Sequence, residues 1–187
     1  MKNYFFISCW LLLYGCKQPA NFNKSEDIRD AFFNGSVTVE KIDKLNKYCV
    51  SIKDTANKTI DKIYTPYTIF DLQTGDINYD GKTDFCVGII KPTPFDSVLK
   101  KRLFIFQIDR NYIRPLWLGS RLSHPYEKFI ILKDPENKNC IRAIEKENKN
   151  LYCITEYKWG SFGMVFRKQC AHGLPFSKAE ALLTKIY

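Results

Sequence analysis

The sequence has little of the chemistry on which most hydrolases depend. Histidine occurs only twice in 187 residues, as His124 before a proline and as His172 within Cys-Ala-His-Gly. Neither context has the ligand spacing of the common zinc sites. The chain also has no Gly-x-Ser-x-Gly elbow, no phosphate-binding Gly-rich loop and no His-Glu-x-x-His motif. Without a recognisable catalytic constellation, the sequence favours a binding protein over an enzyme.

The sequence also has no apolar stretch long enough to form a mature membrane-spanning helix. An apolar stretch covers residues 4–13, after the short basic start Met1-Lys2-Asn3. Its length is that of a signal-peptide core, whereas a transmembrane helix needs about 20 residues. We therefore expect an exported protein with a signal peptide at residues 1–15.

The end of this stretch, Leu13-Tyr14-Gly15-Cys16, resembles the lipobox of bacterial lipoproteins. The resemblance implies that Cys16 is acylated and becomes the N-terminus after cleavage. Residues 16–24 would then be a lipidated tether, and the protein would sit in the cell envelope, in the outer membrane or on its periplasmic face. The alternative is a plain signal peptide that is cleaved elsewhere.

Composition indicates one packed domain after the tether, over residues 25–187. Apolar residues make up 45% of the chain and aromatic residues 15%, which is ample for a core. The net charge is +9, with a Lys-rich stretch at residues 133–149. Because glutamates alternate with those lysines, we expect a solvated loop there, and nucleic acid is an unlikely partner.

The central part of the chain has an all-β pattern. Short β-rich segments recur between turn residues, which predicts antiparallel meanders. Gly160 and Gly163 flank the turn of a predicted hairpin. The expected strands are residues 47–53, 63–71, 85–90, 103–108, 112–118, 128–132, 140–145, 151–157 and 164–168.

Helices are predicted at both ends of this β-rich region. Ser25 would cap a short helix over residues 26–33, with Ile28 on its buried face. Near the C-terminus, Ser177 and Glu180 have the spacing of a capping box, and an apolar face follows them. The fold class is therefore mostly β, with one short N-terminal helix and one C-terminal helix.

The stretch from Gly75 to Ile90 combines alternating oxygen-bearing side chains with an apolar strand. Ca²⁺ takes about 6–8 oxygen ligands, which such a loop can supply together with water. The alternative is a plain turn rich in Asp and Asn. The predicted ligands are the side chains of Asp76, Asn78, Asp80 and Asp84 and the backbone carbonyl of Lys82.

This loop departs from an EF-hand, because Val87 stands where the bidentate Glu belongs and a strand follows. Asp-x-Asn-x-Asp-Gly-x-x-Asp before a hydrophobic strand instead resembles the calcium loop of FG-GAP/VCBS-type repeats. That resemblance covers about Gly75 to Ile90, and it implies a structural Ca²⁺ and propeller-type blades.

An internal repeat is suggested by aligning residues 86–90 with 140–144 and residues 103–106 with 151–154. The repeat-like units span about residues 72–120 and 128–170. The second loop, from Asp134 to Asn139, has lost the ligand pattern, so we expect one calcium site. Two to three propeller-type blades could stack openly or be closed from elsewhere, since a closed propeller typically has 4–8. Chance similarity between two β-meanders is the alternative.

The remaining cysteines and aromatic residues have two interpretations each. The cysteines could pair, with Cys153 near Cys170 and Cys86 near Cys140, or remain buried thiols, which the sequence favours. The aromatic residues between Trp117 and Phe166 favour core packing over exposed sugar-stacking faces.

Two sets of residues are candidates for contact with a ligand or substrate. Arg114, Trp117 and Arg121 form a possible ligand rim for an unknown protein or glycan partner. The alternative function is a glycan-processing hydrolase that uses a carboxylate pair drawn from Asp96, Asp109 and Glu156. We favour a lipid-anchored binding or interaction module with a structural calcium loop.

Overall fold

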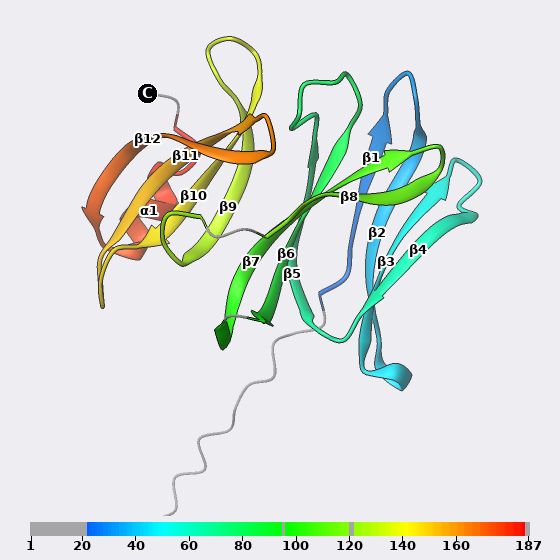
Figure 1. The fold of residues 1–187 in the computed structure, drawn as a ribbon, viewed down its shortest axis with the longest axis horizontal. Helices are drawn as coiled ribbons and strands as arrows, with labels where there is room; N and C mark the ends of the chain where they lie inside the picture. Colours follow the sequence, from blue (N-terminus) through cyan, green and yellow to red (C-terminus); the bar gives the residue numbers. More distant parts are fainter. Residues whose placement is uncertain (1–21, 95, 120–121, 186–187) are drawn as a thin grey trace, which may run out of the picture.

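The structure, a computed structural model, describes residues 22–94, 96–119 and 122–185, and strands make up most of them. They form three four-stranded sheets, each an antiparallel meander in chain order (Figure 1). The first sheet contains β1 (Lys24–Arg29), β2 (Asn34–Ile42), β3 (Lys47–Asp54) and β4 (Thr59–Thr65). The second contains β5 (Thr68–Gly75), β6 (Asp84–Thr93), β7 (Asp96–Asp109) and β8 (Tyr112–Leu118). The third contains β9 (Tyr126–Lys133), β10 (Asn139–Lys146), β11 (Tyr152–Gly160) and β12 (Gly163–Leu174).

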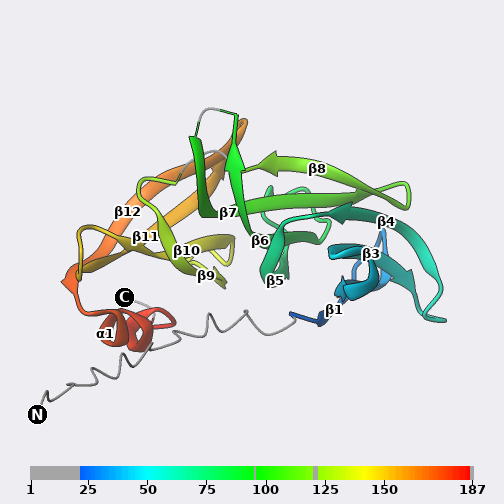
Figure 2. The ribbon, with the colours of Figure 1, turned by 90° about the horizontal axis from the view of Figure 1, so that it is seen from below.

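Helical segments are short in the described chain. A 3₁₀ turn, Asp43–Leu45, separates β2 from β3, and helix α1 (Phe176–Leu182) follows the third sheet. Figure 2 shows α1 in red below the third sheet. No helix of the described residues is long and apolar enough to cross a membrane. The predicted signal peptide, Cys16 and most of the tether lie outside the described residues.

Three hydrophobic clusters lie between the successive sheets and between the third sheet and α1. The first cluster lies between the first two sheets and includes Val37, Ile52 and Val87. The second lies between the second and third sheets and includes Ile105 and Phe129. The third lies between the third sheet and α1. The second and third sheets are therefore each covered on both faces.

This double coverage explains why β6 is buried continuously from Asp84 to Ile89 and β10 from Asn139 to Glu145. In β6, Val87 and Ile89 belong to the first cluster, whereas Cys86 belongs to the second. In β10, Ile141 belongs to the second cluster and Ile144 to the third. Alternate side chains enter different cores, so neither strand shows the apolar-polar alternation of a half-exposed strand.

The first strands of the three sheets contact one another in series, β1 with β5 and β5 with β9. Lys24 Nζ donates to the Leu72 carbonyl at 2.6 Å, which joins β1 to β5. The Gln73 side chain joins β5 to β9 by donating to the Phe129 carbonyl (2.8 Å) and accepting from the Ile131 N–H (2.9 Å). Adjacent sheets are therefore connected by hydrogen bonds from side chains to backbone groups, and not by strand pairing.

The mostly β, antiparallel prediction is confirmed, and so is the C-terminal helix. The predicted repeat alignment places β6 with β10 and β7 with β11, which are the second and third strands of their sheets. The hairpin is also confirmed, because Gly160 pairs with Gly163 across a two-residue turn.

The predicted N-terminal helix over residues 26–33 is wrong. Residues 24–29 form β1, which pairs with β2, and Ile28 is buried as a strand residue. The Asp30 carboxylate then accepts the N–H groups of Phe32 and Phe33, which makes a turn. The spacing of apolar residues fitted a helix, but pairing with β2 determined the conformation.

Two smaller predictions also need correction. The expected strand over residues 63–71 is the end of β4 and the start of β5, joined by a turn in which the Tyr67 N–H donates to the Thr65 hydroxyl. The Ser177 capping box is absent, because α1 starts at Phe176 after Pro175 and has no side-chain cap. Lys24, the last residue of the predicted tether, is the first residue of β1.

Candidate functional site

The predicted calcium loop joins β5 to β6 and contacts both neighbouring sheets. The Thr83 N–H donates to Asp30 Oδ2 (2.7 Å) in the β1–β2 turn of the first sheet. Asn139 at the start of β10 donates its side-chain N–H to the Asp76 carbonyl (2.9 Å), and the Tyr79 hydroxyl donates to the Asn139 carbonyl (2.9 Å). The loop therefore lies where all three sheets meet.

Backbone N–H groups hold the predicted ligands Asp76, Asn78 and Asp80 in the loop. The Asp80 N–H donates to Asp76 Oδ1 and to Asn78 Oδ1, both at 3.1 Å. The Gly81 N–H donates to Asp76 Oδ2 (3.0 Å), and the Lys82 N–H donates to Asp80 Oδ1 (2.9 Å). Gly81 has φ +83°, a left-handed conformation that glycine adopts without strain. The three side chains are thus gathered on a tight turn.

Asp84 closes the loop from inside the protein. Its side chain is fully buried, and Oδ2 accepts the N–H groups of Ile77 (2.9 Å) and Asn78 (3.3 Å). Asp84 Oδ1 has no hydrogen-bond partner among the described residues. Burial raises the pKa of Asp84 to about 7, with a further small rise from the nearby charges of Asp80 and Asp76. A buried carboxylate oxygen without a partner is costly unless a cation or proton compensates it.

The donor set suits a hard divalent cation. Three carboxylates and one amide oxygen come from Asp76, Asn78, Asp80 and Asp84, and Ca²⁺ prefers such oxygen ligands. The Lys82 ammonium lies over the Phe32 ring, 5.1 Å from its centroid. Within the described part of the chain, no three His, Cys, Asp or Glu side chains are arranged as a metal-binding group. Asn78 Nδ2 donates to Asp80 Oδ2 (3.1 Å), so cation binding here would require these side chains to rearrange.

The corresponding loop of the third sheet, between β9 and β10, is organised differently. Asp134 Oδ1 accepts the N–H groups of Glu136 and Lys138, both at 2.9 Å. Its other oxygen forms an ion pair with Lys158 on β11, and Arg167 on β12 lies 3.8 Å from it. The Lys158 ammonium lowers the pKa of Asp134 to about 2. A side-chain cation therefore compensates the carboxylate of this loop.

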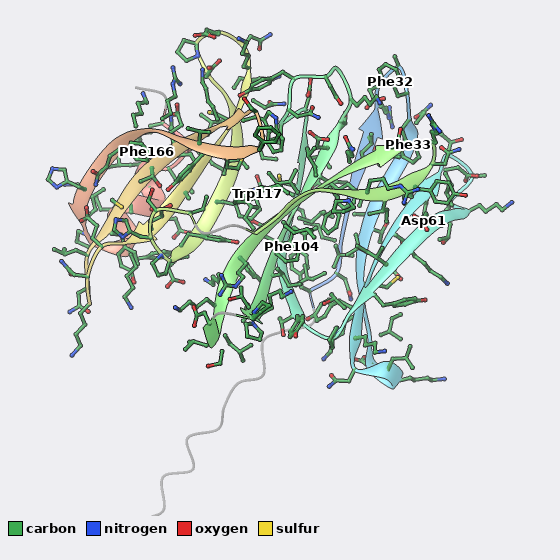
Figure 3. All side chains as sticks on the ribbon, in the orientation of Figure 1. Phe32, Phe33, Asp61, Phe104, Trp117 and Phe166 are labelled. Atoms are coloured by element: carbon green, nitrogen blue, oxygen red, sulfur yellow. The ribbon has the colours of Figure 1, made fainter. Side chains whose placement is uncertain are left out.

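Of the predicted ligand rim, the structure describes Arg114 and Trp117, which differ in exposure. Arg114 is exposed on β8, with its guanidinium 5.2 Å from the Tyr112 ring centroid. Trp117 is buried in the second core cluster, between the second and third sheets (Figure 3). A Cβ atom at Gly163 would meet Trp117 Nε1 at 2.6 Å, so the indole packs directly on the β11–β12 turn. Arg121 lies outside the described residues.

The carboxylates considered for a hydrolase lie far apart. Asp96 and Asp109 stand at the two ends of the 14-residue strand β7, about 40 Å apart along the strand at about 3.3 Å per residue. Glu156 is buried in the third sheet, where it pairs with Arg142 (2.8 Å) and with Arg167 (2.5 Å). These ion pairs lower the pKa of Glu156, although burial opposes them. No two of the three face each other across a shared cleft.

The five cysteines of the described chain carry free thiols, and four of them are buried. Burial raises the pKa of Cys86 well above its ordinary value and the pKa of Cys140 and Cys153 to about 11. They are therefore poor nucleophiles and serve as small apolar core residues.

The residues that connect this loop and strand β5 to the other sheets were not predicted from the sequence. Asp30, Gln73 and Asn139 bind backbone groups of other sheets, and each partner is distant in sequence. None of the three lies within a predicted strand, so no local pattern pointed to them. Comparison with protein-family models and with curated proteins finds no match for this chain.

Proposed function

We propose that this chain is a lipid-anchored envelope protein with one structural Ca²⁺, and that it acts as a binding or interaction module. The observation that carries the proposal is the β5–β6 loop, in which three aspartates and one asparagine gather where three sheets meet. A cation bound here would compensate the buried Asp84 Oδ1, which has no hydrogen-bond partner among the described residues.

The predicted role of the cation is structural. A Ca²⁺ held by Asp76, Asn78, Asp80, Asp84 and the Lys82 carbonyl would neutralise carboxylates that otherwise repel one another. It would also fix the loop that binds Asp30 of the first sheet and Asn139 of the third. The ion would thereby strengthen contacts between sheets.

The three sheets are consistent with propeller-type blades that do not form a closed ring. Each sheet is a four-stranded meander, and the first strands β1, β5 and β9 contact one another in series. Blades of a propeller are likewise four-stranded sheets arranged around a common centre. The proposed blade arrangement presents its outer strands and the connecting loops to a partner, which we take to be an envelope protein or a glycan.

The hydrolase alternative has less support, because Asp96 and Asp109 are separated by the length of β7 and Glu156 is neutralised by two arginines. A glycosidase needs two carboxyl groups roughly 5–9.5 Å apart across the scissile bond. No described observation favours that arrangement here.

Thermal unfolding with calcium and with chelator tests the proposed metal site. A loop with three carboxylates and no bidentate Glu should bind Ca²⁺ with a dissociation constant of about 10⁻⁴–10⁻³ M. At a tenfold excess over that constant, mass action adds about 1.4 kcal/mol to the free energy of unfolding. Each kcal/mol shifts the midpoint of a domain of this size by about 2–4 °C, so calcium should raise it by about 3–6 °C.

Two variants identify where the ion acts. Asp80→Ala should abolish the calcium-dependent rise in the midpoint, because Asp80 is a predicted ligand. The matched control is Asp27→Ala, an exposed aspartate of β1 that accepts a hydrogen bond from Arg29. It should keep the full rise. An equal calcium response in wild type and Asp80→Ala would show that the loop is only a turn.

A further inference from the structure

The described chain enters the fold at one end of the sheets, where β1 begins. Antiparallel pairing puts the start of β1 beside the end of β2. β4 ends beside the start of β3 and passes into β5, whose start lies beside the end of β6. The β2–β3 turn and the β6–β7 hairpin therefore leave the sheets at this same end, the lower edge of Figure 1. The predicted calcium loop, between the end of β5 and the start of β6, lies at the opposite end.

The third sheet places its β10–β11 turn at this end as well. The start of β9 is joined to the start of β7 by the ion pair of Lys101 with Glu127 (2.7 Å). The end of β10 pairs with the start of β9, and the Lys146 N–H donates to the Pro125 carbonyl (2.8 Å). Three connections therefore share this end, and we call them the tether-side turns: residues 42–47, 91–100 and 146–151.

The β6–β7 hairpin protrudes from the second sheet and exposes apolar side chains. β5 begins opposite Ile90 and β8 ends opposite Phe104, so within the described residues the strands of the hairpin beyond these positions pair only with each other. Val98 and Leu99 are 56% and 64% exposed on this hairpin, and Leu45 is 57% exposed in the β2–β3 turn. Large apolar side chains with this exposure gain free energy when they enter an apolar medium.

The tether-side turns are also basic. They contain six lysines and three acidic residues, which gives a net charge of +3, and the neighbouring Lys101–Glu127 pair adds none. Lys100 pairs with Asp96 at 2.7 Å. Four of the other lysines are exposed and form no ion pair within the described part of the chain: Lys44, Lys47, Lys146 and Lys149. The predicted calcium loop at the opposite end instead contains three aspartates. The charge of the tether-side turns therefore suits an anionic partner.

We propose that the tether-side turns dock on an anionic lipid surface, with Val98 and Leu99 in the interface and the lysines toward the phospholipid head groups. Interfacial membrane binding combines apolar side chains with lysines, and anionic leaflets attract basic segments. A lipid surface is the occupant because the chain from Cys16 enters the fold at this end. The inference rests on the proposed lipid anchor and extends it. A second contact would fix the orientation of the domain and turn the calcium loop away from the membrane.

Tryptophan quenching in vesicles tests which end of the fold meets the lipid. Mature protein with Leu99→Trp is reconstituted in vesicles of phosphatidylcholine and phosphatidylglycerol, with or without bromine on the acyl chains, which quenches tryptophan on contact. An interfacial side chain lies about 5–10 Å into the boundary, so the added signal should fall at least about twofold. The matched control is Phe162→Trp, at a position that is 96% exposed at the opposite end and should not be quenched. If Leu99→Trp is quenched no more than Phe162→Trp, the proposal is overturned and this end is left to a protein partner.

The charge requirement is tested in the Leu99→Trp protein. Quenching should be stronger in the anionic vesicles than in phosphatidylcholine alone, and it should fall in about 1 M salt, where the Debye length is about 3 Å. Because one lysine near an anionic surface favours docking about fivefold, Lys44→Gln should lower the ratio of docked to undocked protein by about that factor. Lys58→Gln, an exposed lysine of the β3–β4 turn at the opposite end, should leave the ratio unchanged. Equal quenching in neutral and anionic vesicles would contradict the assignment.

Mass spectrometry of the N-terminal peptide in the same samples separates this proposal from the lipid anchor. Acylated protein in which Leu99→Trp is not quenched would overturn the docking surface and leave the anchor in place. Protein without acyl chains that is still quenched when vesicles are added would overturn the anchor and support the docking surface.

Discussion

Two loops at equivalent places in neighbouring sheets stabilise their carboxylates by different means. At the β5–β6 loop, Asp84 forms no ion pair with a side chain of the described residues, and burial raises its pKa to about 7. In the β9–β10 loop, Asp134 is paired with Lys158, and its pKa is lowered to about 2. A loop that has lost the ligand pattern thus has a lysine ammonium beside its carboxylate.

This difference predicts an acid-stability effect of Lys158→Met. Because Lys158 lowers the pKa of Asp134, the pair contributes stability fully above the ordinary pKa of 3.8 and loses it as the pH falls toward about 2. The variant should therefore unfold at a higher pH than wild type in an acid titration followed by circular dichroism. The difference in unfolding free energy between the two proteins should shrink as the pH falls from 5 to 2.

Lys178→Met, on an exposed position of α1, serves as the control and should titrate as wild type does. A Lys158→Met protein whose acid midpoint equals that of the control would show that the ion pair adds nothing to stability.

At the residue scale, sequence analysis succeeds where the interacting groups are close in the chain. Asp76, Asn78 and Asp80 alternate within one loop, so their gathering could be predicted from spacing alone. Lys158 lies on β11, whereas Asp134 precedes β10. The pairing of β10 with β11 brings the two residues together. The sequence contains no local pattern for such a contact.

At the element scale, strands were identified where the turns around them were clear. The failures came at the start of the chain and at the junction of the first two sheets. Residues 26–33 carried a helix-like spacing, but β2 supplied a hydrogen-bonding partner that spacing does not report. Pro66 lies inside the predicted strand 63–71 and was the available sign of a break there.

A repeated turn pattern was also visible in the sequence and was missed. Asp54-Thr-Ala-Asn57-Lys58 and Asp134-Pro-Glu-Asn137-Lys138 share Asp-x-x-Asn-Lys. In both, the Asp carboxylate accepts two N–H groups, and the Asn adopts a positive φ, +63° and +61°. Asparagine tolerates that conformation better than most residues. The pattern marks a hairpin turn.

The contact between β5 and β9 predicts that Gln73→Leu destabilises the fold. The Gln73 amide both donates to and accepts from the backbone of β9, and leucine can do neither. Gln73 Nε2 also donates to Asp71 Oδ2 (3.0 Å), so leucine loses three hydrogen bonds. At about 1 kcal/mol each, the free energy of unfolding should fall by about 3 kcal/mol. The melting midpoint should fall by about 6–12 °C. Gln169→Leu, an exposed glutamine of β12, should change it little.

If Gln73→Leu melts with the same midpoint as wild type, the amide bridge does not help hold the second sheet to the third. Denaturant unfolding gives an independent reading. A reduced denaturant slope with separate transitions would indicate that the third sheet has become uncoupled.

At the scale of the whole molecule, the order of sheets follows from which strands are buried on both faces. β6 and β10 are buried on both faces, so each must lie in a sheet with a neighbouring layer on each side. For β6 this could have been inferred from the continuous apolar residues 85–90, whereas in β10 the charged residues Arg142 and Glu145 interrupt the apolar ones. The side-chain bridges between sheets, by contrast, depend on long-range geometry that composition and spacing do not report.

The start of β1 limits how far the fold could stand from a membrane if Cys16 is acylated. Lys24 is fixed to β5 through its hydrogen bond to the Leu72 carbonyl. The eight residue steps from Cys16 to Lys24 span at most about 28 Å when fully extended. The β-rich domain would therefore be held close to the lipid surface.

The proposed lipid anchor predicts that Cys16→Ser moves the protein from the membrane fraction to the soluble fraction. Two or more acyl chains give stable attachment, because each buried CH₂ contributes about 0.8 kcal/mol, whereas serine cannot be acylated in this way. Membrane fractionation with mass spectrometry of the N-terminal peptide measures both the location and the attached mass. Cys170→Ser, which changes a partly buried thiol of the third sheet, should stay in the membrane fraction. A Cys16→Ser protein that remains there as firmly as wild type would refute the anchor.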